Sequence, residues 1–322
     1  MQDTLLQIKN LYVEYQTNKG ILGKKQIIHA VNGVSIDIQK GEILAIAGES
    51  GCGKSTLAKT IIQLEPAKSG EIIFEGQNTL ELNKKKLKSF RQKAQMVFQN
   101  PYSSLNPKMK IIDTLKEPLL INTQMSNSEI EKIIEEKIEL VGLDKSCLQL
   151  YPHEFSGGQR QRIAIARSLV LNPEFILADE PVSALDVSIQ AQIINLIKDL
   201  KDKYNLTFLL ITHDMSVIKY LADRVAIMYL GEIVELGTTF SIFNNPKHPY
   251  TKALLNAVPN FKKRASTNIL TGDLPSPENL PNGCKFHTRC PYVMPICREK
   301  APSEISVTER HCVKCFLYNQ SK

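Results

Sequence analysis

Residues 48–56 read Gly48-Glu49-Ser50-Gly51-Cys52-Gly53-Lys54-Ser55-Thr56. A largely apolar run at 41–47 precedes them and predicts a buried strand, and a helix-compatible segment at 57–62 follows. A loop of the form G-x-x-x-x-G-K-[ST] between a strand and a helix is the phosphate-cradling P-loop in its required context. Its glycines let backbone N–H groups and the positive end of the next helix face a phosphate. The loop therefore predicts a nucleotide site, with Lys54 on the outer phosphates and Ser55 on Mg²⁺.

The composition of the 322 residues is that of an ordinary globular chain, with 43% hydrophobic and 23% charged residues. The length predicts one large domain and a smaller one. No run approaches the roughly 18 apolar residues of a membrane span, and no signal peptide is predicted at the N-terminus. The net charge of +7 comes from scattered lysines. This charge is compatible with nucleic acid or an anionic membrane surface, but it more often reflects solvated faces.

Strand and helix patterns alternate along the chain. The expected strands are 5–15, 31–38, 70–75, 95–98, 175–178, 207–211, 224–228 and 232–235, and the expected helices include 159–170, 187–203 and 215–222. A further helix is expected from Ser128, which forms a capping box with Glu131, to Gly142. This alternation predicts an α/β fold with a parallel sheet covered on both faces. A mostly helical block at about 100–165 interrupts the strands and is predicted to be an inserted subdomain.

Two adjacent acids, Asp179 and Glu180, end the apolar strand at 175–178. In parallel sheets, ligands bind at the carboxyl ends of the strands. Following a P-loop, Asp179 is predicted to hold the Mg²⁺ that bridges the outer phosphates. Glu180 is predicted to orient or deprotonate the attacking water.

A second helix start suited to anions is predicted where Ser156 and two glycines open the helix at 159–170. The alternative is a plain N-cap with a flexible approach. One chain rarely needs two such starts for one nucleotide unless two copies cooperate. The motif reads Phe155-Ser156-Gly157-Gly158-Gln159-Arg160-Gln161-Arg162. Here the sequence resembles the ATP-binding cassette (ABC) family, whose signature motif it matches residue for residue.

The resemblance covers roughly residues 5–260 and includes further motifs in the family's order. Gln99 matches the Q-loop glutamine, which senses Mg²⁺ and the attacking water, and His213 matches the switch histidine that contacts the γ-phosphate. Ser183-Ala184-Leu185-Asp186 matches the D-loop, which communicates between subunits. Tyr15 stands where the family places an aromatic ring on adenine, and Tyr12 competes for that role. The family implies a P-loop NTPase fold with a RecA-like parallel sheet, and hydrolysis of ATP with Mg²⁺.

These matches give the predicted site. The nucleotide contacts are Tyr15, Gly48, Ser50, Gly51, Cys52, Gly53, Lys54, Ser55, Thr56, Ser156, Gly157, Gly158, Gln159 and Asp186. The catalytic residues are Gln99, Glu180 and His213, and the Mg²⁺ ligands are Ser55, Gln99 and Asp179. Cys52 lies near Lys54 and a helix N-terminus, which favours its thiolate. Alkylation of Cys52 is therefore expected to block ATP binding.

The resemblance also implies partners. Family members pair two cassettes head to tail, so this single cassette pairs with itself or with a sister subunit. Residues 98–107, 179–192 and 245–251 resemble the oligopeptide/dipeptide permease ATPases, and Pro181-Val182-Ser183 resembles their F-type subunit. The implied partners are a D-type sister ATPase, two transmembrane permease subunits and, indirectly, an external peptide-binding protein. No nucleic-acid partner is implied.

This subfamily implies a peripheral location at the cytoplasmic face of the inner (cell) membrane. Residues 100–107 are the candidates for receiving a coupling helix of the permease. An importer of nickel or another small solute from the same permease subfamily is an alternative, because substrate choice resides in other subunits. A soluble ABC ATPase without a transport role is a further, weaker alternative.

Five cysteines crowd near the C-terminus, and in a cytosolic protein such a cluster points to metal before disulfides. This region resembles the peptide-permease C-terminal region, in which some members hold a [4Fe–4S] cluster. Cys284, Cys290, Cys297 and Cys315 match the family spacing, and Cys312 is extra. Four thiolates would equally satisfy zinc, and small buried thiols in a proline-rich cap are the alternative to any metal. The predicted domains are a nucleotide-binding domain at 1–250 and a small Cys-rich extension at 251–322.

Overall fold

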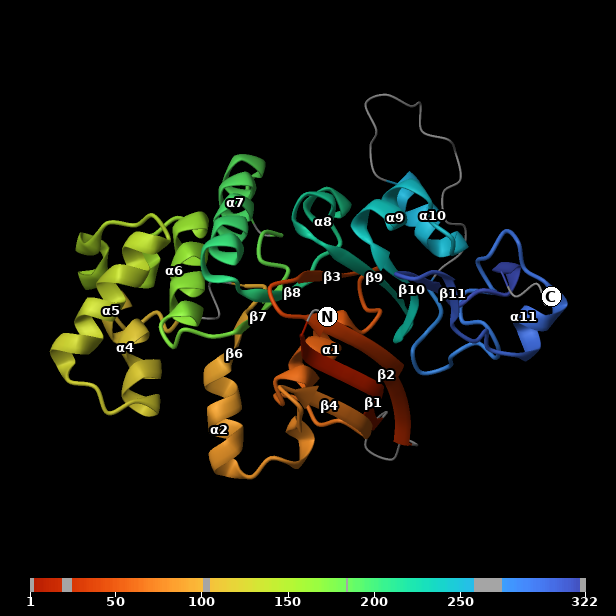
Figure 1. Cartoon of the computed structure of the whole chain (residues 1–322), viewed down its shortest axis with the longest axis horizontal. Coiled ribbons are helices and arrows are strands. Elements are labelled where there is room, and N and C mark those ends of the chain that lie inside the picture. Colours follow the sequence, from red (N-terminus) through yellow and green to blue (C-terminus); the bar gives the residue numbers. More distant parts are fainter. Residues whose placement is uncertain (1–2, 19–24, 101–104, 184, 258–273, 319–322) are drawn as a thin grey trace. The chain divides into compact units, whose positions relative to one another are not determined.

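The structure is a computed structural model that describes residues 3–18, 25–100, 105–183, 185–257 and 274–318 (Figure 1). The chain divides into two compact units. The helical unit consists mainly of Glu81–Ile211, with the short segment Gln39–Glu42. The P-loop unit consists of Thr4–Ile38, Ile43–Leu80 and Thr212–Lys322.

In the P-loop unit, the predicted strand before the P-loop is β3 (Ile43–Ala47), and every residue of it is buried. It runs parallel to β9 (Arg224–Tyr229), and the helix after the loop is α1 (Lys54–Ile61). Antiparallel pairing then continues from β9 to β10 (Glu232–Thr238), β12 (His311–Val313) and β11 (Ile305–Thr308). The end of the chain thus shares a sheet with the P-loop strand.

A second sheet of the P-loop unit has the order β2-β1-β4-β5 (Figure 1). Its strands are β1 (Thr4–Asn18), β2 (Lys25–Gln39), β4 (Ser69–Phe74) and β5 (Gln77–Asn78). Leu6 and Ile8 of β1 are fully buried and lie opposite Phe74 and Ile72 of β4. The strands predicted at 5–15, 31–38 and 70–75 are therefore confirmed, and the first two are longer than their apolar pattern.

The remaining helices of this unit are α8 (Met215–Leu221), α9 (Thr239–Asn244), α10 (Pro249–Asn256) and α11 (Pro295–Glu299). The imidazole Nδ1 of His248 caps α10 by accepting the backbone N–H of Tyr250 at 3.1 Å. Burial lowers the pKa of His248 to about 3, so this histidine stays a neutral acceptor. Of these four helices, the sequence predicted α8.

In the helical unit, β6 (Ala94–Val97), β7 (Phe175–Asp179) and β8 (Thr207–Ile211) form a parallel sheet in which β7 and β8 are fully buried. The helices are α2 (Lys84–Lys93), α4 (Ile111–Asn122), α5 (Asn127–Leu140), α6 (Gly157–Leu169) and α7 (Val187–Tyr204). Short 3₁₀ turns of this unit lie at Lys145–Gln149 and Pro152–Glu154, whereas that at Phe316–Tyr318 belongs to the P-loop unit and that at Thr79–Glu81 lies where the chain passes from one unit to the other. Strands followed by crossover helices give the expected α/β arrangement.

The capping box of α5 differs from the prediction. The side chain of Ser126, rather than Ser128, accepts from the backbone N–H of Glu129, and Glu129 bonds back to the N–H of Ser126 at 2.8 Å. The sequence offers two overlapping S-x-x-E frames. The earlier frame gives a longer helix, and each residue added to a helix brings another backbone hydrogen bond.

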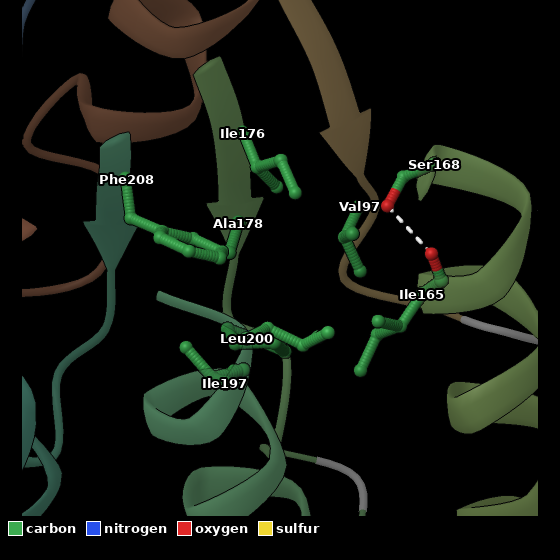
Figure 2. A pocket seen from close by; sticks show the side chains of 9 residues that line it. Val97, Ile165, Ser168, Ile176, Ala178, Ile197, Leu200 and Phe208 are labelled. Atoms are coloured by element: carbon green, nitrogen blue, oxygen red, sulfur yellow. Dashed lines mark hydrogen bonds between the residues drawn. The ribbon is translucent and has the colours of Figure 1, made fainter. Parts of the chain in front are cut away.

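A small apolar pocket lies in the core of the helical unit (Figure 2). Its lining consists of Val97, Ile165, Ser168, Ile176, Ala178, Pro181, Ile197, Leu200 and Phe208. The hydroxyl of Ser168, the polar side chain of this lining, donates to the Ile165 carbonyl at 2.7 Å. Because the lining offers no further side-chain hydrogen-bonding group, the pocket is a packing gap and not a nucleotide site.

Within the described ranges, no helix combines the length and the apolar character that a membrane crossing requires.

Candidate nucleotide site

The P-loop is folded around the side chain of Lys54, which is 5% exposed. Its ammonium group donates to the backbone carbonyls of Gly48 at 2.8 Å and Glu49 at 2.9 Å. No side chain caps the start of α1, so backbone N–H groups of its first turn are available to a ligand. A cation and an uncapped helix N-terminus together make an anion site.

Gly53 shows why this loop needs glycine. Its φ of +105° is a conformation that L side chains rarely adopt. A Cβ atom at this position would lie 2.1 Å from the carbonyl oxygen of Ala30. Because the backbone of Ala30 approaches Gly53 so closely, glycine is the residue that fits at the N-cap position of α1.

The prediction of a reactive Cys52 thiolate is wrong. The side chain of Cys52 is buried, and burial raises the pKa of the thiol. Lys54, whose ammonium lies 3.7 Å from the sulfur, opposes this shift but does not reverse it. Desolvation of the charged form outweighs the nearby cation and the helix N-terminus on which the sequence argument rested.

The two candidates for stacking on adenine occupy different surroundings. Tyr15 is partly buried beside Thr56 and Glu65, and burial raises the pKa of its hydroxyl. The Tyr12 hydroxyl lies against Gly33, and the Tyr12 ring is exposed. Tyr15 is therefore the tyrosine next to the P-loop helix.

His213 follows the carboxyl end of β8, and its side chain is exposed. The backbone N–H of the preceding Thr212 donates to the carbonyl of Ile46 at 3.3 Å, near the end of β3. Asp214 then caps α8 by accepting the N–H groups of Ser216 at 2.8 Å and Val217 at 3.3 Å. These bonds place His213 at the same end of the unit as the P-loop.

In the helical unit, the predicted acids lie at the carboxyl end of β7. Asp179 is buried, and Glu180 follows it with a φ of +46°. The backbone N–H of Glu180 donates to the Ile211 carbonyl at 2.8 Å, and its carboxylate accepts from the Gln99 amide at 2.6 Å. This left-handed conformation is strained for a residue with a side chain, and the hydrogen bonds of Glu180 hold it there. The structure thus brings Gln99, Asp179 and Glu180 together at one sheet edge.

The signature motif begins α6. Ser156 is exposed and forms a capping box with Gln159, whose side chain accepts the Ser156 N–H at 3.0 Å. Gly158 is required for packing, since a Cβ atom there would lie 2.3 Å from Cγ2 of Ile189 on α7. Ser156 is therefore an N-cap, as the alternative interpretation of this motif expected. It is exposed at the start of α6.

The D-loop precedes α7, and its Ala184 lies outside the described residues. The amide of Gln190 donates to the carbonyls of Val182 at 3.1 Å and Leu185 at 2.9 Å, and Asp186 is the residue at the N-cap position of α7. Gln190 was not predicted as a site residue. In the sequence, the available signal was that Gln190 lies within the stretch 179–192, which resembles the peptide-permease ATPases.

Another residue that the sequence analysis did not assign is Tyr250 in α10. Its hydroxyl accepts the backbone N–H of Glu49 at 2.8 Å. Burial raises the pKa of Tyr250, so the hydroxyl stays protonated. The resemblance of 245–251 to peptide-permease ATPases was the available signal, but it gave no role for this ring.

The four cysteines that match the family spacing, Cys284, Cys290, Cys297 and Cys315, lie near one another in the P-loop unit. Burial, followed by the charges of Cys297, Cys315 and Cys290, raises the pKa of Cys284 to about 12. The backbone N–H of Cys284 donates to the Cys297 carbonyl at 2.9 Å. No set of three or more His, Cys, Asp and Glu side chains in the described part of the chain is arranged to hold a metal ion.

Two family models of known proteins match this chain, and both are families of transporters. Residues 31–183 match the family model "ABC transporter", and residues 234–297 match "Oligopeptide/dipeptide transporter, C-terminal region". The chain is 48% identical to the oligopeptide transport ATP-binding protein AppF of Bacillus subtilis, over 99% of this chain and 98% of that protein. It is 45% identical to the dipeptide transport ATP-binding protein DppF of Escherichia coli, over 100% and 97% of the two chains.

A similar fold occurs in the dimeric structure of a post-hydrolysis state of the ATP-binding cassette MJ0796 bound to ADP and Pi. The identity is 31% and the TM-score 0.65, over 73% of this chain and 99% of that one. The predicted fold class and family resemblance are confirmed. The chain therefore belongs to the ABC transporter family, as an ATP-binding cassette of the oligopeptide/dipeptide transporter type.

Proposed function

We propose that this chain hydrolyses ATP to drive the uptake of oligopeptides or dipeptides through a membrane permease. The observation that carries the proposal is the match to peptide transport ATP-binding proteins over almost the whole of both chains, including the C-terminal region. Membership of the ABC family implies ATP and Mg²⁺ as ligands of the cassette. Transport of peptides is the function that those relatives' names give.

In this proposal the P-loop unit binds ATP. Lys54 exchanges the carbonyls of Gly48 and Glu49 for outer phosphate oxygens, which are stronger acceptors because they are charged. Tyr15 stacks on adenine, and Gly48, Ser50, Gly51, Cys52, Gly53 and Thr56 line the phosphates. His213 contacts the γ-phosphate.

The helical unit supplies the acids for hydrolysis. Asp179 and Gln99 are the proposed Mg²⁺ ligands of this unit, as Ser55 is of the P-loop unit, and the ion would supply charge stabilisation to the phosphates. Glu180 accepts the proton of the attacking water, and the Gln99 amide orients its carboxylate. Positioning and electrostatics account for most of such catalysis, so no covalent nucleophile is needed.

The site is proposed to be completed by a second cassette. Ser156, Gly157, Gly158 and Gln159 present an exposed helix start that would face the γ-phosphate held by the partner's P-loop, with Asp186 nearby in that interface. The dimeric MJ0796 cassette supports such pairing. The F-type resemblance of Pro181-Val182-Ser183 favours a D-type sister subunit as the partner.

Two transmembrane permease subunits and an external peptide-binding protein complete the proposed importer, with this chain at the cytoplasmic face of the membrane. Of the docking candidates 100–107, residues 101–104 lie outside the described residues. The apolar side chains of Phe98, Leu120, Ile121 and Met125 are exposed in the helical unit. Exposed apolar groups of this kind suit a protein interface.

The transport function is tested with cells in which the native copy is replaced by a Lys54→Ala variant. Uptake of a labelled tripeptide should fall to background, while uptake of a free amino acid should not change. Uptake of ⁶³Ni²⁺ is measured in the same cells. If nickel uptake is lost while peptide uptake is intact, the transported substrate is a small solute and not a peptide. If neither uptake is lost, the chain has no role in their transport.

We also propose that Cys284, Cys290, Cys297 and Cys315 are ligands of a [4Fe–4S] cluster or zinc. Four cysteine sulfurs suit either metal, and burial with neighbouring sulfur charges raises the pKa of Cys284, Cys290 and Cys315, a penalty that a bound cation would compensate. The thiols would have to reorient, since they do not stand in metal-binding geometry. Iron, sulfide and zinc are measured in anaerobically purified protein and in a Cys284→Ser variant. Absence of all three from the wild-type chain would overturn the proposal.

A further inference from the structure

Glu49, the second residue of the P-loop, is held by three separate contacts. Its backbone N–H donates to the Tyr250 hydroxyl at 2.8 Å, and its carbonyl accepts from Lys54 at 2.9 Å. Its carboxylate accepts two hydrogen bonds from the guanidinium of Arg289, at 2.7 Å from Nη1 to Oε2 and 3.0 Å from Nη2 to Oε1. The Cys-rich extension therefore reaches the phosphate-binding loop directly.

The Arg289–Glu49 pair is sheltered from water. The Arg289 side chain is 5% exposed and that of Glu49 is 28% exposed. Arginine stays protonated throughout the ordinary pH range, and Arg289 donates both hydrogen bonds to Glu49, so the cation is permanent. Two-point pairing of guanidinium and carboxylate fixes orientation as well as charge, and it is among the stronger hydrogen-bonded contacts in proteins.

The position of Arg289 is set by a buried aromatic cluster. The Phe286 ring packs edge-on against Tyr229 at 5.2 Å between ring centres and lies 5.4 Å from Tyr250. The backbone N–H of Arg289 donates to the Phe286 carbonyl at 3.0 Å. The same cluster thus carries both the Tyr250 hydroxyl and the Arg289 guanidinium to Glu49.

A carboxylate within an anion-binding loop opposes phosphate binding, because like charges repel over several ångströms at the dielectric of a partly buried site. Glu49 lies between Gly48 and Ser50, both predicted phosphate contacts. Arg289 cancels this charge and turns the carboxylate toward the extension. Without Arg289 the loop would carry an uncompensated anion close to the β- and γ-phosphates.

We propose that Arg289 is a positioning residue for nucleotide binding, which neutralises and orients Glu49 so that the C-terminal extension forms a working part of the ATP site. This inference rests on the proposed function only in that the P-loop binds ATP. Arg289 acts through Glu49 and does not itself contact the nucleotide.

The test compares full-length variants by calorimetric titration with ATP in EDTA, and by the steady-state KM and kcat for Mg–ATP. Arg289→Gln should weaken ATP binding about tenfold and raise KM by a similar factor, with kcat less affected. Adding Glu49→Gln to Arg289→Gln should restore affinity to within about threefold of wild type, because the uncompensated charge is gone. Arg298→Gln, an exposed arginine of the same extension, is the control and should bind as wild type does.

Two outcomes would overturn the inference. One is wild-type affinity in Arg289→Gln, and the other is a loss that the double variant does not recover. Should Arg289→Gln not fold, Arg289→Lys keeps the charge but not the two-point contact, and it should bind ATP about threefold more weakly than wild type. Wild-type affinity in that variant would overturn the orienting role of Arg289, and a tenfold loss there would overturn charge cancellation. A wild-type chain that binds no ATP would instead overturn the proposed function.

Discussion

The side-chain amide of Gln99 donates a hydrogen bond to Oε2 of Glu180 at 2.6 Å. Glu180 is also held at its backbone, where its N–H donates to the Ile211 carbonyl at 2.8 Å. Its φ of +46° costs about 1 kcal/mol or more for a residue with a side chain. The surrounding structure thus holds the proposed general base at the end of β7 from both sides.

This pairing predicts how substitutions at the two positions combine. Glu180→Gln should lower ATP turnover about 100-fold or more while ATP still binds, because the proton acceptor is lost. Gln99→Ala should lower turnover about tenfold by releasing the carboxylate. The double variant should lose less than the product of the two single losses, since the part of the role of Gln99 that orients the base is already gone in Glu180→Gln. Phosphate release under saturating ATP measures all three, and additive losses would show that Gln99 acts through another group.

A second prediction concerns the signature helix. Gly158→Ala should destabilise the protein by about 1–3 kcal/mol, because the added Cβ would lie 2.3 Å from the stiff, branched side chain of Ile189. Chemical denaturation measures the loss. Ile189→Ala, combined with Gly158→Ala, should recover most of the stability by removing the clashing methyl group. Equal stability of the single variant and wild type would contradict the packing argument.

The sequence predicted the elements that depend on local pattern. Apolar runs identified β3, β7 and β8, and the motifs identified the ends at which Lys54 and Glu180 lie. Features set by contacts between distant segments were not predictable in this way. Arg289 meets Glu49 across 240 residues of sequence, and β12 is a strand because it pairs with β10. No local pattern encodes either contact.

The capping-box error has a related physical origin, because two frames with equal local chemistry differ only in the helix length they allow. The error at Cys52 arose because sequence shows the neighbouring cation and helix start but not the burial that outweighs them. The sequence-based predictions at Cys52 and at the start of α5 were therefore wrong because each depended on two competing contributions, and the sequence does not show which of the two is larger.

The raised pKa of Cys52 gives a third prediction. Alkylation by N-ethylmaleimide at pH 8, followed by peptide mass mapping, should label Cys52 at least about tenfold more slowly than free cysteine. In urea the rate should rise to that of free cysteine. The ratio of the two rates should shrink as the pH rises above the ordinary pKa of cysteine, because the free thiol is then fully ionised while ionisation of Cys52 still increases. Rapid labelling of the folded chain would show that Cys52 is accessible and ionised.

The last prediction concerns the contact that fastens the extension to the sheet. Nε2 of His311 on β12 lies 2.7 Å from Oε1 of Glu235 on β10, and both side chains are buried. The same carboxylate accepts the backbone N–H groups of Lys247 at 2.7 Å and His248 at 2.8 Å. One buried acid therefore serves three donors, and its loss leaves all three without that acceptor.

Glu235→Ala should accordingly lower the free energy of unfolding by about 3 kcal/mol, and His311→Ala by about 2 kcal/mol, because the loss of His311 leaves two of the three bonds intact. Urea denaturation followed by far-UV circular dichroism measures both. Glu309→Gln, an exposed acid between β11 and β12, is the matched control and should change stability by less than about 0.5 kcal/mol. If His311→Ala were as costly as Glu235→Ala, the backbone bonds would contribute nothing, and the histidine alone would fasten the extension.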